Sequence, residues 1–206
     1  NTPEFGAGGN TFNDVFGATR NPWDLTKSVA GSSGGSAAAL ASGTAWLAHG
    51  SDFGGSLRNP ASFCGVVGLR PSPGRVANGP NLRPFQNLGV QGPMARNVAD
   101  IALFFDAMTG QSSLDPCSLV SPKNSFLTAS QARKKPRKVA ISLNLGFMPV
   151  DDEVKSICNK AALKFEKPGV IVEEAHPKLE NIVKTFWILR SNLFAATMGN
   201  MAKQNP

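Results

Sequence analysis

The chain has 206 residues and a mass of 21.7 kDa, and 41% of its residues are hydrophobic, which is enough for a sizeable core. Only 17% of the residues are charged, whereas Gly occurs 21 times, Pro 15 times and Tyr not at all. This composition excludes a disordered tail and indicates a loop-rich α/β protein. The apolar stretches are far shorter than the roughly 20 residues that a membrane span requires, so we expect no membrane span.

The first residues lack a basic start, an apolar run and a Met, so they predict no signal peptide and indicate an internal fragment of a longer protein. Cys64, Cys117 and Cys158 are an odd, widely spaced set without a Cys-x-x-Cys pair. This spacing argues against a disulfide framework and a structural zinc site. We therefore expect a cytoplasmic protein with no metal and no cofactor.

The net charge of +7 belongs mainly to residues 111–206, which hold fourteen Lys or Arg and eight Asp or Glu. Many of these basic residues lie in 123–138, a stretch without an acidic residue that ends in ARKKPRK. Aromatic residues for base stacking do not alternate with the charges. We therefore interpret 111–138 as a solvated basic connector and expect no nucleic-acid binding.

Hydrophobic spacing predicts a loop-rich start followed by helices and strands. Residues 1–35 are mostly loop, an Ala-rich run predicts a buried helix over 36–48, and CGVVGL predicts a strand over 64–69. Apolar spacing predicts a helix that begins near Arg96 or Asn97 and stops at Gly110. The three Trp residues, 23, 46 and 187, are expected to pack in the interior.

The second half of the chain alternates strands and helices. Strands are predicted over 138–145 and 169–175, and helices over 151–166 and 179–202. Asp151 and Asp152 suit the positive N-terminal end of the first of these helices. The alternation implies parallel strand pairing, and hence an α/β fold with a mixed sheet flanked by helices.

Two serine-rich clusters, GSSGGS at 31–36 and SDFGGS at 51–56, are the strongest candidates for chemistry. Glycine-rich loops that open a helix present backbone N–H groups to an anion or a developing oxyanion. A bound phosphate is one reading, but the loop has neither the Gly-Lys-Ser/Thr ending of a P-loop nor the G-x-G-x-x-G order of a dinucleotide site.

The spacing of the clusters allows Ser32 and Ser56 to meet. A helix of about 13 residues spans roughly 20 Å, and a returning extended segment covers the same distance. A serine nucleophile needs a group that accepts its proton. The chain has only two histidines: we interpret His49 as a cap at a helix end and His176 as an exposed loop residue.

A rival reading is the G-x-S-x-G nucleophile elbow of an α/β-hydrolase esterase. Gly31, Ser33 and Gly35 fit that pattern, and Asp151 or Asp152 and then His176 follow in the matching chain order. The elbow requires a strand directly before the serine, and the residues before Ser33 have a weak strand pattern.

The stretch from NPWDLTKSVAGSSGGSAAAL through GSDFGGSLRNPASFCGVVGLRPSPGRV resembles the signature block of the amidase signature family of serine amide hydrolases. The resemblance extends to NTPEFG and GPMARNVADIALFFDAMTG, and more weakly to the end of the chain. It implies one partial amidase domain over 1–206, with a signature region 1–110, the basic connector 111–138 and a strand–helix–strand–helix portion 139–206. It also implies that the fold is incomplete in this chain.

The resemblance assigns roles to the serines. Ser56 matches the family's nucleophile, and Ser32 matches a proton-relaying serine that follows a non-proline cis peptide. The relay ends on a buried neutral lysine upstream, which the chain lacks; Lys27 is interpreted as a surface or structural residue. Ala30 departs from the family, which often has Gly there.

Other residues of the clusters are expected to support these two serines. The expected oxyanion-hole donors are the backbone N–H groups of Phe53, Gly54, Gly55 and Ser56. Ser33, Asp52 and Arg58 are expected to hold the loop, and Cys64 to be a small buried side chain.

The predicted function is hydrolysis of a carboxylic acid amide through an acyl-enzyme, with a small-molecule amide as substrate and the isolated fragment inactive. One alternative within the family is the glutaminase-type subunit of a tRNA-dependent amidotransferase, with partner subunits; a homodimer is another arrangement. The esterase that uses Ser33 and a non-catalytic relative complete the alternatives.

Overall fold

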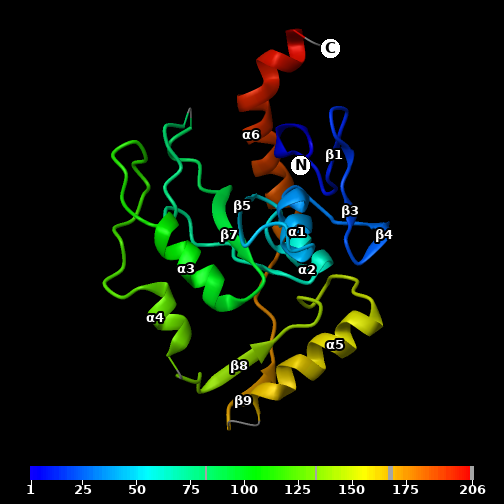
Figure 1. Cartoon of the computed structure of the whole chain (residues 1–206), viewed down its shortest axis with the longest axis vertical. Coiled ribbons are helices and arrows are strands. Elements are labelled where there is room, and N and C mark those ends of the chain that lie inside the picture. Colours follow the sequence, from blue (N-terminus) through cyan, green and yellow to red (C-terminus); the bar gives the residue numbers. More distant parts are fainter. Residues whose placement is uncertain (82, 133, 167–168, 205–206) are drawn as a thin grey trace. The chain divides into compact units, whose positions relative to one another are not determined.

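The computed structural model describes residues 1–81, 83–132, 134–166 and 169–204 (Figure 1). The contacts within the chain form two compact units, Asn1–Ala132 and Arg133–Pro206. Helices and strands occur together, and the predicted mixed α/β class is confirmed. The assignment of all 206 residues to one domain stays a prediction.

Short elements open the first unit, where the sequence predicts mostly loop. The 3-10 helix η1 (Glu4–Gly6) precedes two small antiparallel pairs. The first pair joins β1 (Phe12–Asn13) to β2 (Gly17–Ala18), and the second joins β3 (Arg20–Asn21) to β4 (Asp24–Ser28).

Helix α1 (Gly34–Ala41) is shorter than the sequence predicts. Gly43 follows it with a φ of +77°, a left-handed backbone conformation that suits glycine and ends helices. Residues 47–48, expected at the end of this helix, belong instead to strand β5 (Leu47–Asp52). The helix predicted from the Ala-rich pattern was wrong for these two residues, because pairing with a neighbouring strand overrides intrinsic helix propensity. The expected burial of the helix is confirmed for one face, which includes Ala37 and Leu40.

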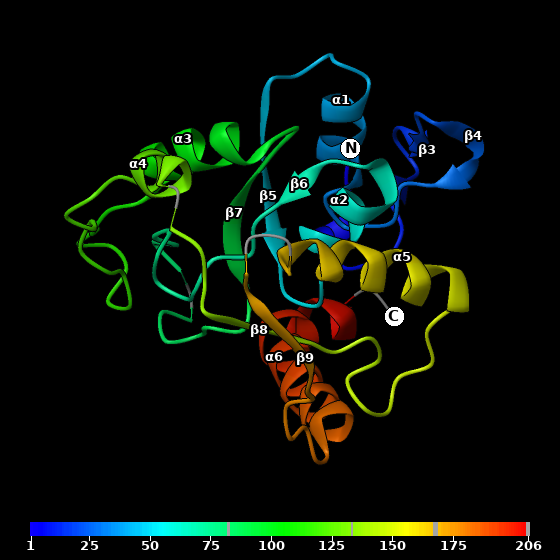
Figure 2. The ribbon, with the colours of Figure 1, turned by 90° about the horizontal axis from the view of Figure 1, so that it is seen from below.

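A three-stranded antiparallel sheet lies at the centre of the first unit (Figure 2). Strand β7 (Val90–Ala95) is in the middle, with β5 on one side and β6 (Val67–Gly68) on the other. The β5–β7 ladder runs from Leu47↔Ala95 to Asp52↔Val90. The predicted strand over 64–69 is confirmed only at β6.

Helix α2 (Arg58–Cys64) was not predicted. Pro60 lies in its first turn, where a missing N–H costs little, and Gly65 ends it with a φ of +66°. Helices α1 and α2 share a core with the sheet. Its buried members, Cys64 included as predicted, are Val29, Ala37, Leu40, Leu57, Ala61, Cys64 and Met94.

Helix α3 (Val98–Met108) confirms the prediction, and its start is set by Asn97, whose side chain accepts a hydrogen bond from Asp100 N. The basic connector 111–138 is not wholly irregular, because it contains helix α4 (Phe126–Gln131). Asp106 on α3 accepts hydrogen bonds from the N–H groups of Phe126 and Leu127 at 2.7 and 3.0 Å. These contacts attach α4 to α3.

The second unit has the predicted strand–helix–strand–helix order. Strands β8 (Lys138–Ile141) and β9 (Ile171–Glu174) pair in parallel, which confirms the predicted pairing. Between them lie α5 (Asp152–Ala162) and the 3-10 helix η2 (Leu163–Phe165). Asp151 caps α5 by accepting a hydrogen bond from Glu153 N, and α6 (Ile182–Gln204) follows β9.

The expectation that the three Trp residues pack in the interior was wrong. Trp23, Trp46 and Trp187 are 72%, 80% and 57% exposed. Trp23 still contributes a hydrogen bond, from its indole N–H to the carbonyl of Cys64 at 2.7 Å. Within the ranges that the structure describes, none of the helices is both long enough and apolar enough to cross a lipid bilayer.

Candidate active site

The two serine clusters meet at one end of the sheet of the first unit. Helix α1 leads away from the first cluster and β5 returns along the sheet to the second. The N–H of Ser33 donates to the carbonyl of Ser56 at 3.3 Å. The helix-and-return geometry expected from the spacing therefore brings the clusters into contact.

Ser32 lies in a tightly held loop and is 2% exposed. The Gly31–Ser32 peptide is a non-proline cis peptide, as the resemblance implied. The Thr11 hydroxyl braces the loop by donating to Ala30 O at 2.9 Å and accepting from Gly34 N at 3.1 Å. A Cβ on Gly31 would lie 2.9 Å from the backbone of Asn10, so only glycine fits there.

The two hydroxyls of the expected relay are not directly bonded to each other. In the part of the chain that the structure describes, no hydrogen bond joins the Ser32 and Ser56 side chains. Ser32 is buried and Ser56 is partly buried. Catalytic hydrogen bonds are often long in the absence of substrate and tighten in the complex.

Asp52, at the end of β5, organises the loop that leads to Ser56. Its carboxylate is fully buried and accepts hydrogen bonds from Gly55 N at 2.9 Å and Leu57 N at 3.2 Å. Burial by itself would raise the pKa of this carboxyl, but hydrogen bonds from Arg58 and from these two backbone N–H groups, with the Arg58 charge, lower the pKa to about 2. The group is therefore a carboxylate at neutral pH.

Two arginines share this carboxylate. Arg58 donates from Nε to Oδ2 and from Nη2 to Oδ1, both at 3.0 Å. The hydrogen bond to Asp52 raises the pKa of Arg58. Arg70 donates from Nη1 to Oδ1 at 2.9 Å and also to the Asp52 carbonyl. Asp52 and Arg58 were predicted to hold the loop, but Arg70 was not, because no local spacing connects residues 18 positions apart.

The backbone of the loop carries the four N–H groups that are expected to serve an oxyanion. Gly55 has a φ of +112°, and a Cβ there would lie within 3 Å of the Asn59 side chain, so the position requires glycine. The Gly55 N–H already donates to Asp52. This N–H is therefore already engaged, whereas Gly54 is exposed at the surface of the loop, and the oxyanion-hole role of these groups stays a prediction.

The hydroxyl of Ser33 is hydrogen-bonded to the backbone of the neighbouring strand. This hydroxyl accepts from Ser51 N at 3.2 Å and donates to Ser51 O at 3.4 Å, and the residue is 4% exposed. Strand β4 does precede this loop, contrary to expectation, but it belongs to a two-stranded antiparallel hairpin. The elbow of an α/β-hydrolase follows a strand of the main sheet, so this geometry does not favour Ser33 as a nucleophile.

Of the two histidines, one lies in the kind of segment that the sequence indicates and the other does not. His49 lies within β5, opposite Pro93, so its interpretation as a helix cap was wrong. His176 is a loop residue as predicted, and its Nδ1 lies 2.8 Å from Ser142 Oγ. Lys27 is exposed on β4, in agreement with its interpretation as a surface residue.

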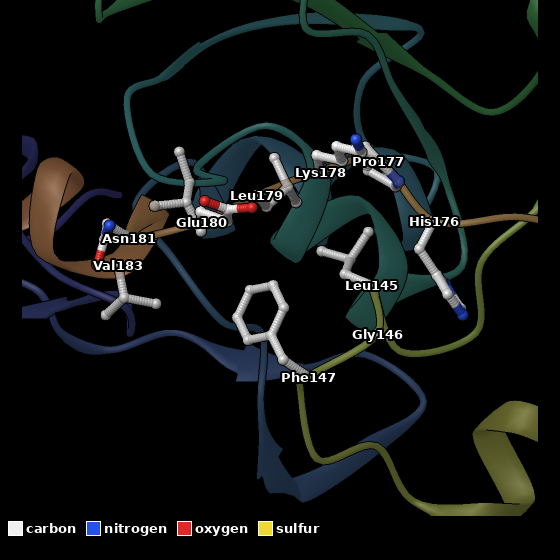
Figure 3. Close-up of a pocket in the computed structure, with 11 residues that line it drawn as sticks. Leu145, Gly146, Phe147, His176, Pro177, Lys178, Leu179, Glu180, Asn181 and Val183 are labelled. Carbon is white, nitrogen blue, oxygen red and sulfur yellow. The ribbon is translucent and has the colours of Figure 1, made fainter.

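A cavity of about 520 Å³ lies in the second unit, between residues 145–147 and 176–183. Figure 3 shows Phe147 and Leu145 at this cavity and the ring of His176 directed away from Phe147. Across the described ranges, no group of three His, Cys, Asp or Glu side chains is arranged to hold a metal ion.

Known proteins resemble the chain along almost its whole length. The model of the Amidase family matches residues 1–204. An acylamidase of Rhodococcus erythropolis is 43% identical over 187 residues, which are 91% of this chain and 39% of the relative. The A subunit of the glutamyl-tRNA(Gln) amidotransferase of Moorella thermoacetica is 38% identical over 92% of this chain and 39% of that protein.

Solved structures agree with these relatives. A bacterial aryl acylamidase of the amidase signature family superposes with a TM-score of 0.89 and 33% identity, covering 100% of this chain and 43% of the other. The chain thus spans about two fifths of the length of the relatives that it matches. The matches to the family model, to these relatives and to this fold establish that the chain belongs to the amidase signature family.

Proposed function

We propose that the protein hydrolyses a carboxylic acid amide with Ser56 as the nucleophile. The observation that carries this proposal is the contact between the Ser33 N–H and the Ser56 carbonyl at 3.3 Å, because it joins the two clusters that bear the proposed nucleophile and relay. Membership of a family with amide-hydrolysing relatives supports the reaction type.

The proposed reaction begins when Ser56 Oγ forms a bond to the amide carbonyl carbon. The Ser56 proton passes to Ser32, whose own proton passes to a neutral lysine, the third member of the proposed relay. The relay then returns a proton to the leaving amine as the carbon–nitrogen bond breaks. Water hydrolyses the acyl-enzyme by the same route and releases the acid.

The oxyanion formed on the carbonyl oxygen requires fixed donors. The backbone N–H groups of Gly54 and Ser56 are the donors of this proposal, since Gly55 N–H is held by Asp52. Phe53 remains a donor predicted from the sequence. A preorganised donor of this kind lowers the barrier by about 3–4 kcal/mol. Asp52 and Arg58 act indirectly in this proposal, because they set the shape of the loop that carries these N–H groups.

Two substrate classes are consistent with the relatives. The acylamidase supports a small-molecule amide as substrate. The amidotransferase proteins among the relatives support a second proposal, in which the protein releases ammonia from glutamine within a complex of partner subunits. Ammonia release from glutamine that requires both charged tRNA and the partner subunits would support the second class. Hydrolysis of a simple amide by the protein alone would support the first.

The decisive experiment replaces each serine in turn in the complete polypeptide that carries these residues. Ser56→Ala is expected to reduce kcat at least a thousandfold, on the order of the loss known for other serine nucleophiles. Ser32→Ala is expected to cause a large loss as well. Ser36→Ala is the matched control, because this hydroxyl donates to His49 O on β5, at 2.8 Å, and has no part in the proposed reaction.

Three outcomes contradict the proposal. Amide hydrolysis that survives Ser56→Ala would exclude Ser56 as the nucleophile. Ester hydrolysis lost only in Ser33→Ala would favour the elbow-type esterase. A wild-type protein without activity on amides, esters or glutamine would favour the non-catalytic relative.

A further inference from the structure

Three segments of the first unit meet at the guanidinium of Arg70. Arg70 follows β6, and the Leu69 N–H extends the β6–β7 pairing by donating to Pro93 O at 3.1 Å. From this position the side chain reaches the end of β5 and the residues that lead into β7. Its Nη1 donates to the carbonyl and Oδ1 of Asp52, and its Nη2 donates to Leu88 O at 2.9 Å.

Arg58 and Arg70 bind the same carboxylate but have different consequences for the loop. Arg58 is only six residues from Asp52, on the helix that directly follows the loop, and its side chain is 55% exposed. A bond between two parts of the same short turn cannot fix that turn against the rest of the protein. Arg70 is 18 residues away, is 25% exposed and also binds the segment before β7.

We propose that Arg70 is a positioning residue for the hydrolytic reaction, which anchors the Asp52–Ser56 loop to the sheet so that the loop's N–H groups stay aimed at the oxyanion. This inference rests on the proposed function of Ser56. Arg70 does not touch the reacting atoms; it acts through Asp52, whose carboxylate in turn holds the N–H groups of Gly55 and Leu57.

The physical reason lies in the geometry of guanidinium. A planar guanidinium can donate to several acceptors in fixed directions, whereas a lysine ammonium is a compact point charge on a flexible stem. A misplacement of about 1 Å at a reacting centre costs on the order of a hundredfold in rate. Because the oxyanion exists only in the transition state and its intermediates, loosening the loop lowers kcat more than it changes KM.

The test uses Arg70→Gln and Arg70→Lys in the complete polypeptide, with an amide substrate that the wild type hydrolyses. Arg75→Gln is the matched control, since the Arg75 guanidinium donates to Val120 O at 3.1 Å, away from the loop. Reactive serines are counted in each preparation by stoichiometric labelling with a fluorophosphonate. Rates per labelled serine then compare folded sites only.

For Arg70→Gln we expect kcat to fall about 10- to 100-fold while KM changes less than about threefold. Arg70→Lys is expected to recover part of this loss, and Arg75→Gln to match the wild type. An aldehyde that forms a tetrahedral adduct with the serine should bind more weakly to Arg70→Gln in proportion to kcat. A purely structural role would lower the number of labelled serines and leave these ratios unchanged.

The outcomes separate this inference from the proposed function. If Ser56→Ala abolishes activity but Arg70→Gln retains wild-type kcat per labelled serine, the inference on Arg70 is overturned alone. Loss of labelled serines in both Arg70 variants overturns it as well, because Arg70 then serves folding. If the wild type hydrolyses no amide, or Ser56→Ala remains active, the proposed function itself is overturned.

Discussion

Ser33 and Ser51 exchange two hydrogen bonds, in which the Ser33 hydroxyl accepts from the Ser51 N–H at 3.2 Å and donates to the Ser51 carbonyl at 3.4 Å. The hydroxyl thereby binds the start of α1 to β5, one residue before Asp52. This is the bond pattern of a structural serine rather than of a nucleophile, because the hydroxyl proton is committed to a backbone carbonyl instead of a proton-accepting side chain.

Ser33→Ala should therefore reduce stability more than catalysis. Removal of a buried hydroxyl that holds backbone groups costs about 1–3 kcal/mol of unfolding free energy. Denaturant unfolding would measure this loss, and kcat per labelled serine should stay within a few-fold of the wild type. A full loss of kcat with normal stability would contradict this prediction.

The lowered pKa of Asp52 predicts that the folded protein loses stability in acid. This pKa is about 2 in the folded protein, below the ordinary value of 3.8. A lowered pKa means that the carboxylate stabilises the fold above the ordinary pKa and that this stabilisation is lost as the pH falls from about 4 through 2. The contribution is about 2 kcal/mol.

Unfolding measured from pH 6 to pH 2 would test this prediction with Asp52→Asn beside the wild type. The variant should be less stable at pH 6 and should lose less stability than the wild type over the acidic range. Asp24→Asn is a useful control, because the hydrogen bond from the Thr26 side chain also lowers the pKa of Asp24, yet that residue is exposed. Equal slopes for the wild type and Asp52→Asn would refute the assignment.

Ala30 lies directly before the Gly31–Ser32 peptide and has a φ of +58°. A left-handed conformation costs an L-residue roughly 1–2 kcal/mol in the folded state, and glycine avoids this cost. Part of the gain is offset, because glycine has greater conformational freedom in the unfolded chain. Ala30→Gly should therefore raise the unfolding free energy by about 0.5–1 kcal/mol. Val29→Gly is the contrasting variant, because Val29 is a fully buried core residue and its loss should destabilise. Destabilisation by Ala30→Gly would show that packing of the Ala30 methyl outweighs the strain.

The cap of α3 gives a simple measure of local stability. The Asn97 side chain accepts a hydrogen bond from Asp100 N at 2.9 Å. Asn97→Ala should cost about 1 kcal/mol, whereas Asn97→Ser should retain most of the stability, because a serine can make the same cap. Thermal or denaturant unfolding of the three proteins would measure these differences. Equal stability of the Ala and Ser variants would exclude a capping role.

Local signals predicted the elements that depend on local chemistry. The apolar spacing and the cap residue predicted α3, and the alternation of strand and helix predicted the parallel pairing of β8 with β9. The end of α1 could not be predicted in the same way. Leu47 and Ala48 are good helix formers, and only their pairing with Ala95 and Met94 makes them a strand.

In the candidate site, too, features that depend on local sequence could be predicted, whereas features that depend on long-range contacts could not. The serine clusters and the ion pair between Asp52 and Arg58 could be predicted from the sequence, because these residues are close together in it. Arg70 was not, since its contact depends on how β5 and β6 are placed on the two sides of β7. The exposed Trp residues were also missed, because residue type alone predicts burial whereas exposure depends on which surfaces of the fold are covered.

The contacts that shape the serine loop have a consequence for biosynthesis. The contacts described above come from Thr11, from the residues around Ser33 and Asp52, and from Arg70 and Leu88, which lie within one continuous stretch of the first unit. Domains fold from the N-terminal side as the ribosome extends the chain. The cradle around Ser56 can thus assemble while the last residues of the chain are still being translated, and a stalled nascent chain that has emerged from the ribosome as far as residue 132 should already display it.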